Sequence, residues 1–276
     1  MNPRTPKGQN LKSFDDRIPN FSGFRNKFVR YLRSQNLSEA YVMDLTNNLQ
    51  KHMVKPKIHN PQELLKYLDK VASGHFNMAI RVYLNFLVDI EGFDETNAVR
   101  YKKVINGKGS DPDLFVPTNE IVRNTFGKVE EKRFKTVFKI LTFSGIRISE
   151  VVEFLTNYDE TKLMESKDFI KYPLNFILGQ KRSYYVYLPK SLKDELHKYY
   201  INRKVIYDRI ANAGLNPKYL RKWFYNFLIY NNVPESVADI MEGRATQTVG
   251  SMHYLCRVKQ ADYWYEKIVK KLEEVL

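Results

Sequence analysis

The hydrophobic pattern of the chain breaks between Asp94 and Pro117, and this break limits the fold more than any other feature. Before it, from Phe21 to Ile90, apolar residues recur at the spacing of amphipathic helices. The segment KKVINGKGSDPDLFVP then brings two glycines and two prolines, which interrupt helices and are typical of an exposed linker. Helical spacing resumes near Thr118. The chain is therefore expected to fold as two domains rather than around one continuous core.

These changes of pattern predict the domain boundaries. Residues 1–20 are polar, contain prolines and lack periodicity, so we expect a flexible basic arm there. Residues 21–100 contain four predicted helices, enough for a small bundle that is a domain in its own right. A linker is expected over 101–117 and a second domain over 118–276.

The second domain is predicted to be mainly helical with one β-hairpin. The stretch DFIKYPLNFILGQKRSYYVYLP is rich in β-branched and aromatic residues around a turn at 179–182, which is typical of a hairpin. Residues 191–211 read as one helix, with Ser191 and Asp194 as its capping signal. The expected fold class is thus mainly α with a small β-hairpin or sheet.

The charge of the chain points to a polyanionic partner. Lys and Arg outnumber Asp and Glu by 45 to 31, which gives a formal net charge of +14. Nucleic acid is the leading candidate, an anionic membrane surface is the second, and a merely basic soluble protein is the third. No apolar run approaches the length of a membrane span, and the lone Cys256 excludes a disulfide framework or a multi-cysteine zinc site. We therefore expect a soluble intracellular protein.

Two cations of the second domain occupy positions where phosphate could bind. Arg147 follows a Ser-Gly break at the start of a predicted helix, where unpaired backbone donors and a bidentate guanidinium group suit phosphate oxygens. An ion pair with Glu150 or Glu153 is the alternative interpretation. Lys181 lies in the predicted hairpin turn, where lysines are commonly solvated but where an ammonium group could also enter a DNA groove.

A further pair of cations begins a later helix. Lys218 and Arg221 are three residues apart, so they lie on one face of the helix that Asn216-Pro217 opens. Two cations near a helix N-terminus oppose the helix dipole, so either an anion binds between them or the face is simply solvated. The expected buried side of this helix consists of Leu220, Trp223, Phe224 and Phe227.

Four motifs follow one another in the second domain: LTFSGIRISEVVEF, the hairpin with Lys181, NPKYLRKWFYNFL and IMEGRATQTVGSMHYL. In this order they resemble the sequence boxes of tyrosine recombinases. LTFSGIRISEVVEF is similar to the box around the first catalytic arginine, and the hairpin with a lysine at its turn resembles the β2–β3 hairpin of the family. NPKYLRKWFYNFL is similar to the box that normally reads H-x-L-R-H, and IMEGRATQTVGSMHYL resembles the segment that ends at the nucleophile. The helical region before them is similar to the family's core-binding, SAM-like domain, so the resemblance extends from Phe21 over nearly the whole chain.

Two departures refine this resemblance. Lys218 stands where most members have histidine, and Arg244 replaces a second histidine. This version looks like the integrases of archaeal fuselloviruses and related archaeal plasmids. It leaves the general base open, because a lysine does not replace an imidazole near neutral pH.

The resemblance implies a DNA strand transferase. Tyr254 would attack a phosphodiester to give a 3′-phosphotyrosine and a free 5′-hydroxyl. Arg147 and Arg221 would stabilise the charge on the non-bridging oxygens, and Lys181 would protonate the leaving 5′-oxygen.

The remaining site residues follow from the same resemblance. Lys218 and Arg244 would complete the cationic cage, and Lys218 is a candidate base for the nucleophile. His253 adjoins the nucleophile and is interpreted as structural or as a DNA contact. Tyr263 and Tyr265 are competing nucleophiles by type, but they are predicted to pack the last helix.

The implied partners are double-stranded DNA with specific attachment sites and further copies of the chain, as a tetramer on a Holliday junction. No cofactor or metal is expected, since the cations can stabilise the transition state and no carboxylate cluster of a two-metal nuclease appears in the sequence. The expected location is the cytoplasm of a host cell, at the nucleoid, and the last helix would dock in trans or in cis. A Xer-like resolvase, a type IB topoisomerase-like enzyme and a non-catalytic DNA-binding protein are the alternatives.

Overall fold

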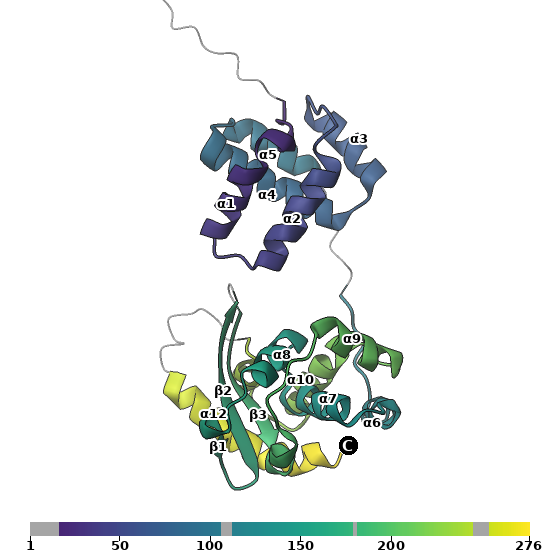
Figure 1. The fold of residues 1–276 in the computed structure, drawn as a ribbon, viewed down its shortest axis with the longest axis vertical. Coiled ribbons are helices and arrows are strands. Elements are labelled where there is room, and N and C mark those ends of the chain that lie inside the picture. Colours follow the sequence, from purple (N-terminus) through teal and green to yellow (C-terminus); the bar gives the residue numbers. More distant parts are fainter. Residues whose placement is uncertain (1–16, 106–111, 179–180, 245–253) are drawn as a thin grey trace, which may run out of the picture. The chain divides into compact units, whose positions relative to one another are not determined.

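The computed structural model describes residues 17–105, 112–178, 181–244 and 254–276, with side chains throughout except at 175–178, 181–183 and 254–256. The chain divides into two compact units, Met1–Pro112 and Asp113–Leu276 (Figure 1). Each unit holds a hydrophobic core of its own. Within the described residues, no helix has the length and apolar character of a membrane span.

The first unit is a helical bundle. Its elements are η1 (Phe21–Gly23), α1 (Arg25–Ser34), α2 (Glu39–His52), α3 (Pro61–Val71), α4 (Gly74–Glu91) and α5 (Glu95–Val104). The central helix α4 places Tyr83 and Phe86 against Phe28, with ring centroids 5.8 and 5.5 Å away in edge-to-face geometry. These fully buried rings form the centre of the bundle core.

The helix α5 was not predicted and occupies part of the expected linker. Asp94 caps this helix by accepting a hydrogen bond from the backbone N–H of Asn97, at 2.8 Å. The helix buries only Ala98 and Tyr101, so its apolar pattern is too sparse to reveal it in the sequence. The predicted bundle therefore gains a fifth helix, and the linker cannot begin at residue 101.

The end of the predicted basic arm belongs to the bundle. Ile18 is buried, and its backbone N–H donates to the carbonyl oxygen of Ile58 at 3.1 Å. The Tyr83 hydroxyl group also donates to the carbonyl oxygen of Pro19 at 3.1 Å, so a buried side chain and backbone hydrogen bonds together attach residues 17–20 to the bundle. The remainder of the predicted arm, 1–16, lies outside the described residues.

The second unit combines helices with a three-stranded antiparallel sheet of order β1-β2-β3. Its elements are α6 (Asn119–Lys128), α7 (Lys132–Ser144), α8 (Ile148–Thr156), η2 (Glu160–Lys162), β1 (Met164–Glu165), β2 (Phe169–Leu178), β3 (Lys181–Pro189), η3 (Lys190–Glu195), α9 (Arg203–Asn212), α10 (Lys218–Tyr230), α11 (Glu235–Met241) and α12 (Tyr254–Glu273). Figure 1 shows α12 alongside β2 and β3. The predicted fold class, mainly α with a small sheet, is confirmed.

The helix predicted over 191–211 is wrong in its first half. The chain forms the 3-10 helix η3 and then continues without regular helix until Asn202 caps α9. In this stretch the backbone N–H of Tyr199 donates to the carbonyl oxygen of Leu155 at 3.0 Å. A tertiary hydrogen bond thus takes a donor that a helix would have used internally.

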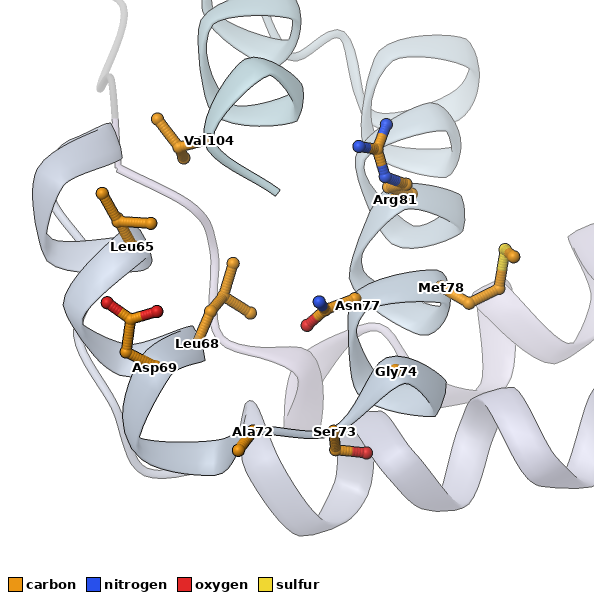
Figure 2. A pocket seen from close by; sticks show the side chains of 10 residues that line it. All are labelled: Leu65, Leu68, Asp69, Ala72, Ser73, Gly74, Asn77, Met78, Arg81 and Val104. Atoms are coloured by element: carbon orange, nitrogen blue, oxygen red, sulfur yellow. The ribbon is translucent and has the colours of Figure 1, made fainter. Parts of the chain in front are cut away.

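A cavity of about 310 Å³ lies in the first unit, where α3 faces α4 near the end of α5 (Figure 2). Its walls include the apolar side chains of Leu65, Leu68 and Val104 together with the charged side chains of Asp69 and Arg81. None of the predicted site residues lines this cavity. The candidate site therefore lies in the second unit and not at this cavity.

Candidate active site

The candidate site is built around the turn between α7 and α8. Gly145 ends α7 with φ +62°, and a Cβ atom at this position would lie 2.3 Å from Cδ1 of Phe224. Glycine therefore allows the turn to approach α10 closely. The Gly145 carbonyl oxygen accepts a hydrogen bond from Nη1 of Arg221 at 2.9 Å, which ties α10 to the turn.

Arg147 lies at the start of α8 and is fixed by Glu150. The backbone N–H of Arg147 donates to one oxygen of this carboxylate, and Nη1 of its guanidinium group donates to the other, both at 2.6 Å. The Glu150 side chain is 1% exposed, whereas that of Arg147 is 27% exposed. The ion pair considered as the alternative interpretation is thus present, and it holds a guanidinium group that solvent still reaches.

Arg221 projects from α10 into the same region. Burial lowers its pKa to about 10, against the attraction of the nearby Glu242 carboxylate. Its guanidinium group is therefore charged at neutral pH, and its Nη2 lies 3.5 Å from Oε2 of Glu242.

Glu242 is a buried carboxylate directly after α11, and it pairs with two arginines. Its side chain is 0% exposed, and its Oε2 lies 2.7 Å from Nε of Arg244 as well as near Arg221. Burial raises the pKa of Glu242 to about 7, because desolvation outweighs the attraction of the arginines. The Arg244 guanidinium also stacks over the ring of Tyr225, at 4.7 Å from its centroid.

The structure thus brings three of the predicted site residues together. Arg147 and Arg244 are close enough for their positive charges to lower the pKa of Arg221 further. In this cluster Arg147 pairs with Glu150, and Arg221 and Arg244 pair with Glu242.

Lys218 has a different partner. Its ammonium nitrogen lies 2.9 Å from Oδ2 of Asp113, and Lys222 lies 3.4 Å from the other oxygen of this carboxylate. The pKa of Asp113 is held well below its usual range, chiefly by the hydrogen bond from Lys218, and the pKa of Lys218 is raised. Lys218 and Arg221, which could have shared one bound anion, instead each face a separate carboxylate of the protein.

The backbone places the two remaining site residues at the starts of elements. Lys181 is the first residue of β3 and pairs with Leu178 of β2, so it lies in the strand rather than in the turn. Tyr254 is the first residue of α12. The side chains of both, and the whole of His253, lie outside the described part of the chain.

The two competing tyrosines differ from each other. Tyr265 is fully buried and its hydroxyl group donates to the carbonyl oxygen of Phe143 at 2.9 Å, so its predicted packing role is confirmed. Tyr263 is 56% exposed and carries the ammonium group of Lys267 over its ring at 4.2 Å, so the predicted packing role is wrong for this residue.

Sequence reasoning assigned no role to Glu242, Tyr225 or Asp113. The only local hint for Glu242 is a carboxylate that directly follows the apolar pair Ile240-Met241, where a buried charge needs a partner. No pattern identifies that partner, because Arg221 comes from another helix.

Comparison with known proteins gives one family and one fold. The family described as "Archaeal phage integrase" matches residues 114–271. No curated protein matches the chain significantly by sequence.

Two crystal structures of lambda integrase resemble the chain. A lambda integrase(75-356) dimer bound to a COC' core site gives a TM-score of 0.60 at 10% identity, covering 83% of this chain and 97% of that chain. A lambda integrase tetramer bound to a Holliday junction gives a TM-score of 0.56 at 10% identity, covering 88% and 83%. These likenesses show a shared fold. The family match covers more than half of the sequence, and the chain therefore belongs to the archaeal phage integrase family of tyrosine recombinases, enzymes that cut and rejoin DNA strands.

Proposed function

We propose that the protein integrates or excises the DNA of an archaeal virus or plasmid at specific attachment sites. The observation that carries this proposal is the gathering of Arg147, Arg221 and Arg244 at one place in the second unit. Guanidinium groups offer paired donors to phosphate oxygens, and preorganised cations stabilise the charge that builds in a pentacoordinate transition state.

In the proposed reaction the Tyr254 hydroxyl attacks the phosphorus atom of a DNA strand. The bond from phosphorus to the 5′-oxygen breaks, and the 3′-phosphate becomes linked to the tyrosine. The tyrosine proton passes to a base, and Lys181 donates a proton to the leaving 5′-oxygen. Lys218 can be that base only after it has lost its own proton, because its pKa is raised by Asp113 in the free protein. Attack by the 5′-hydroxyl of another strand then rejoins the DNA and releases the tyrosine.

The cations have separate parts in this reaction. Arg147 and Arg221 hold the non-bridging oxygens, and Arg244 completes the cage together with Lys218. Since Lys218 is paired with Asp113 in the free protein, the phosphate must compete with that carboxylate for the ammonium group. The Lys218 side chain is 56% exposed, and an exposed ion pair contributes little free energy, so the phosphate can displace the carboxylate.

The proposed partner is double-stranded DNA, bound by both units, with further copies of the chain assembling into a tetramer at the host nucleoid. The net charge of +14 supports a polyanionic partner. The related folds of lambda integrase were captured as a dimer on a core site and as a tetramer on a Holliday junction, which supports the same kind of assembly here.

A covalent adduct tests the chemistry. A bound sequence is first selected from random duplexes, and a nicked suicide duplex carrying it is then incubated with the protein and run on a denaturing gel. We expect an adduct with the wild type and none with Tyr254→Phe. An undiminished adduct with Tyr254→Phe would remove Tyr254 from the reaction, and a wild type that binds without an adduct would favour a non-catalytic DNA-binding protein.

A second experiment separates binding from chemistry. Arg221→Lys keeps a positive charge opposite Glu242 but loses the paired donors, so we expect cleavage to fall by roughly a hundredfold while DNA affinity changes little. Thermal unfolding of the variant checks that the protein remains folded. A parallel collapse of affinity and cleavage would contradict a role in the transition state.

The direction of the reaction is tested with plasmids. An integrase is expected to join two different attachment sites on separate molecules, whereas a Xer-like resolvase resolves a dimer between two identical sites. Efficient resolution without intermolecular joining would replace the proposed role by resolution.

A further inference from the structure

Glu242 is a carboxylate that the proposed reaction does not use, although it lies in the middle of the arginine cluster. It is fully buried, and its Oε2 lies 2.7 Å from Nε of Arg244 and 3.5 Å from Nη2 of Arg221. A buried charge is costly unless it has a task or a partner. Here one carboxylate links two arginines that come from α10 and from the segment after α11.

We infer that Glu242 is a positioning residue, which holds Arg221 and Arg244 at the spacing that the scissile phosphate requires. This inference rests on the proposed function. Glu242 does not touch the DNA in this role; it acts through the two guanidinium groups.

The first observation that supports the inference is the set of contacts of Arg244. Its Nε lies 2.7 Å from Glu242 and its guanidinium carbon lies 4.7 Å from the centroid of the Tyr225 ring, so two neighbours hold one flexible side chain. Among the described residues no acceptor takes a hydrogen bond from its two terminal nitrogens, and the side chain is 42% exposed. This arrangement leaves a pair of oriented donors for an anionic ligand.

The second observation that supports the inference is the arrangement of charges around the arginines. Arg147 is paired with Glu150, while Arg221 and Arg244 share Glu242. Of the two carboxylates beside Arg221 and Arg244, which are Glu242 and Asp239, Glu242 is the one whose side chain lies within ion-pair distance of both arginines. Without Glu242, two like charges would face each other in a partly buried place and would separate.

The third observation that supports the inference is the position of Glu242 against the turn at Gly145. A Cβ atom on Gly145 would lie 3.2 Å from Oε1 of Glu242, so the carboxylate lies directly against the turn that precedes Arg147. Glu242 thus contacts or faces all three segments that supply the arginines. Its removal is expected to loosen Arg244 most, because that arginine has the shortest ion pair with it.

The test compares four full-length proteins on the nicked suicide duplex. These are the wild type, Glu242→Gln, Glu242→Asp and the control Glu120→Gln, which removes the same charge from an exposed position on α6. DNA affinity and single-turnover cleavage are measured separately for each, at about pH 8 and at about pH 6.

At about pH 8 we expect Glu242→Gln to slow cleavage by roughly tenfold or more, with DNA affinity within about threefold of the wild type. Glu242→Asp restores the charge and should recover part of the rate, and Glu120→Gln should match the wild type. Cleavage by Glu242→Gln within about twofold of the wild type, or a parallel loss of affinity and cleavage, overturns the inference.

The pH profile gives a readout that a merely structural residue would not move. The groups that face Glu242 are Arg147 from α8, Arg221 from α10 and Arg244, and the carboxylates beside these arginines are Glu150 and Asp239. The arginines stay charged over this range, so titration of Glu242 itself decides whether the link exists. The ratio of wild-type to Glu242→Gln rates should therefore shrink toward one at about pH 6, and a ratio independent of pH contradicts the inference.

A DNA-free measurement keeps the inference separate from the proposed function. In nuclear magnetic resonance relaxation measurements of the free protein, the Arg244 guanidinium group should be restricted in its motion in the wild type and in Glu242→Asp, because the ion pair at 2.7 Å holds it. The group should move freely in Glu242→Gln. Unchanged motion in Glu242→Gln overturns the inference even if cleavage is never observed, whereas a wild type without adduct overturns only the proposed function.

Discussion

At the scale of single residues, Gly145 sets how closely α7 and α10 approach each other. We expect Gly145→Ala to lower the free energy of unfolding by about 2–4 kcal/mol, because φ +62° strains an alanine and its Cβ atom would meet the Phe224 ring. Urea denaturation measures this change. The matched control is Gly127→Ala within α6, where nothing lies within 4 Å and where alanine should stabilise the helix by up to about 1 kcal/mol. Equal effects at the two glycines would contradict the packing argument.

Glu242 leads to a prediction about stability and pH. Burial raises its pKa from 4.5 to about 7, so between these values the folded protein keeps a proton that the unfolded chain releases. The free energy of unfolding should therefore fall as the pH rises through this range. Between about pH 5 and about pH 8, the free energy of unfolding of the wild type should fall by roughly 2–3 kcal/mol more than that of Glu242→Gln.

Urea titrations of both proteins at the two pH values provide the measurement. Because the neutral side chain avoids the cost of a buried charge, Glu242→Gln should be the more stable protein at about pH 8, even though its cleavage is expected to be slower. A variant that is less stable than the wild type at this pH would show that the ion pairs outweigh burial.

The arginines of the site could be selected from the sequence, and so could Glu150, the local partner of Arg147, but the partner of Arg221 could not. Arg147 and Arg221 stand out because each lies near a helix start, where a cation opposes the dipole. The identity of the carboxylate opposite Arg221 depends on how α10 and α11 pack, and no local pattern encodes that packing. The same limit applies to Lys218, whose partner Asp113 comes from the segment before α6.

At the scale of elements, α12 is attached to the sheet and to α7 by polar contacts. Asp262 accepts hydrogen bonds from Lys171 at 2.6 Å and from the hydroxyl group of Tyr187 at 2.9 Å. Tyr265 adds a buried hydroxyl that donates to Phe143. Since Tyr254 begins this helix, these contacts also determine where the proposed nucleophile starts.

Tyr265→Phe tests this attachment and the choice of nucleophile together. The variant leaves buried carbonyl oxygens without their donor, so we expect the free energy of unfolding to fall by about 1–2 kcal/mol. The covalent adduct with DNA should still form, in contrast to Tyr254→Phe. Loss of the adduct in a Tyr265→Phe protein that remains folded would reopen the assignment of the nucleophile.

Elements were predictable where their burial pattern is dense and were missed where it is sparse. The helix α4 buries most of one face and was evident from its spacing, whereas α5 buries only Ala98 and Tyr101 and was not predicted. The helix predicted to begin at residue 191 was wrong over 191–202 for another reason. The composition there favours a helix, but tertiary contacts, such as the hydrogen bond from Tyr199 to Leu155, stabilise a different backbone path. Propensity alone cannot reveal either case.

At the scale of the whole molecule, positive charge is spread evenly over two separately packed units. Residues 1–112 contain 18 Lys and Arg against 11 Asp and Glu, and residues 113–276 contain 27 against 20. Each unit therefore carries an excess of seven positive charges and a core of its own. If both units bind the phosphate backbone, neither alone can account for the salt dependence of DNA binding.

The salt dependence of DNA affinity tests this division of charge. For the full chain, raising the salt concentration from about 50 to about 200 mM should weaken binding by roughly a thousandfold or more, because neutralised phosphates release counterions. A fragment of residues 113–276, checked for folding by circular dichroism, should show roughly half the slope of log affinity against log salt. Fluorescence anisotropy with one labelled duplex measures both slopes. Equal slopes would place all phosphate contacts in the second unit, and a flat response of the full chain would contradict electrostatic binding altogether.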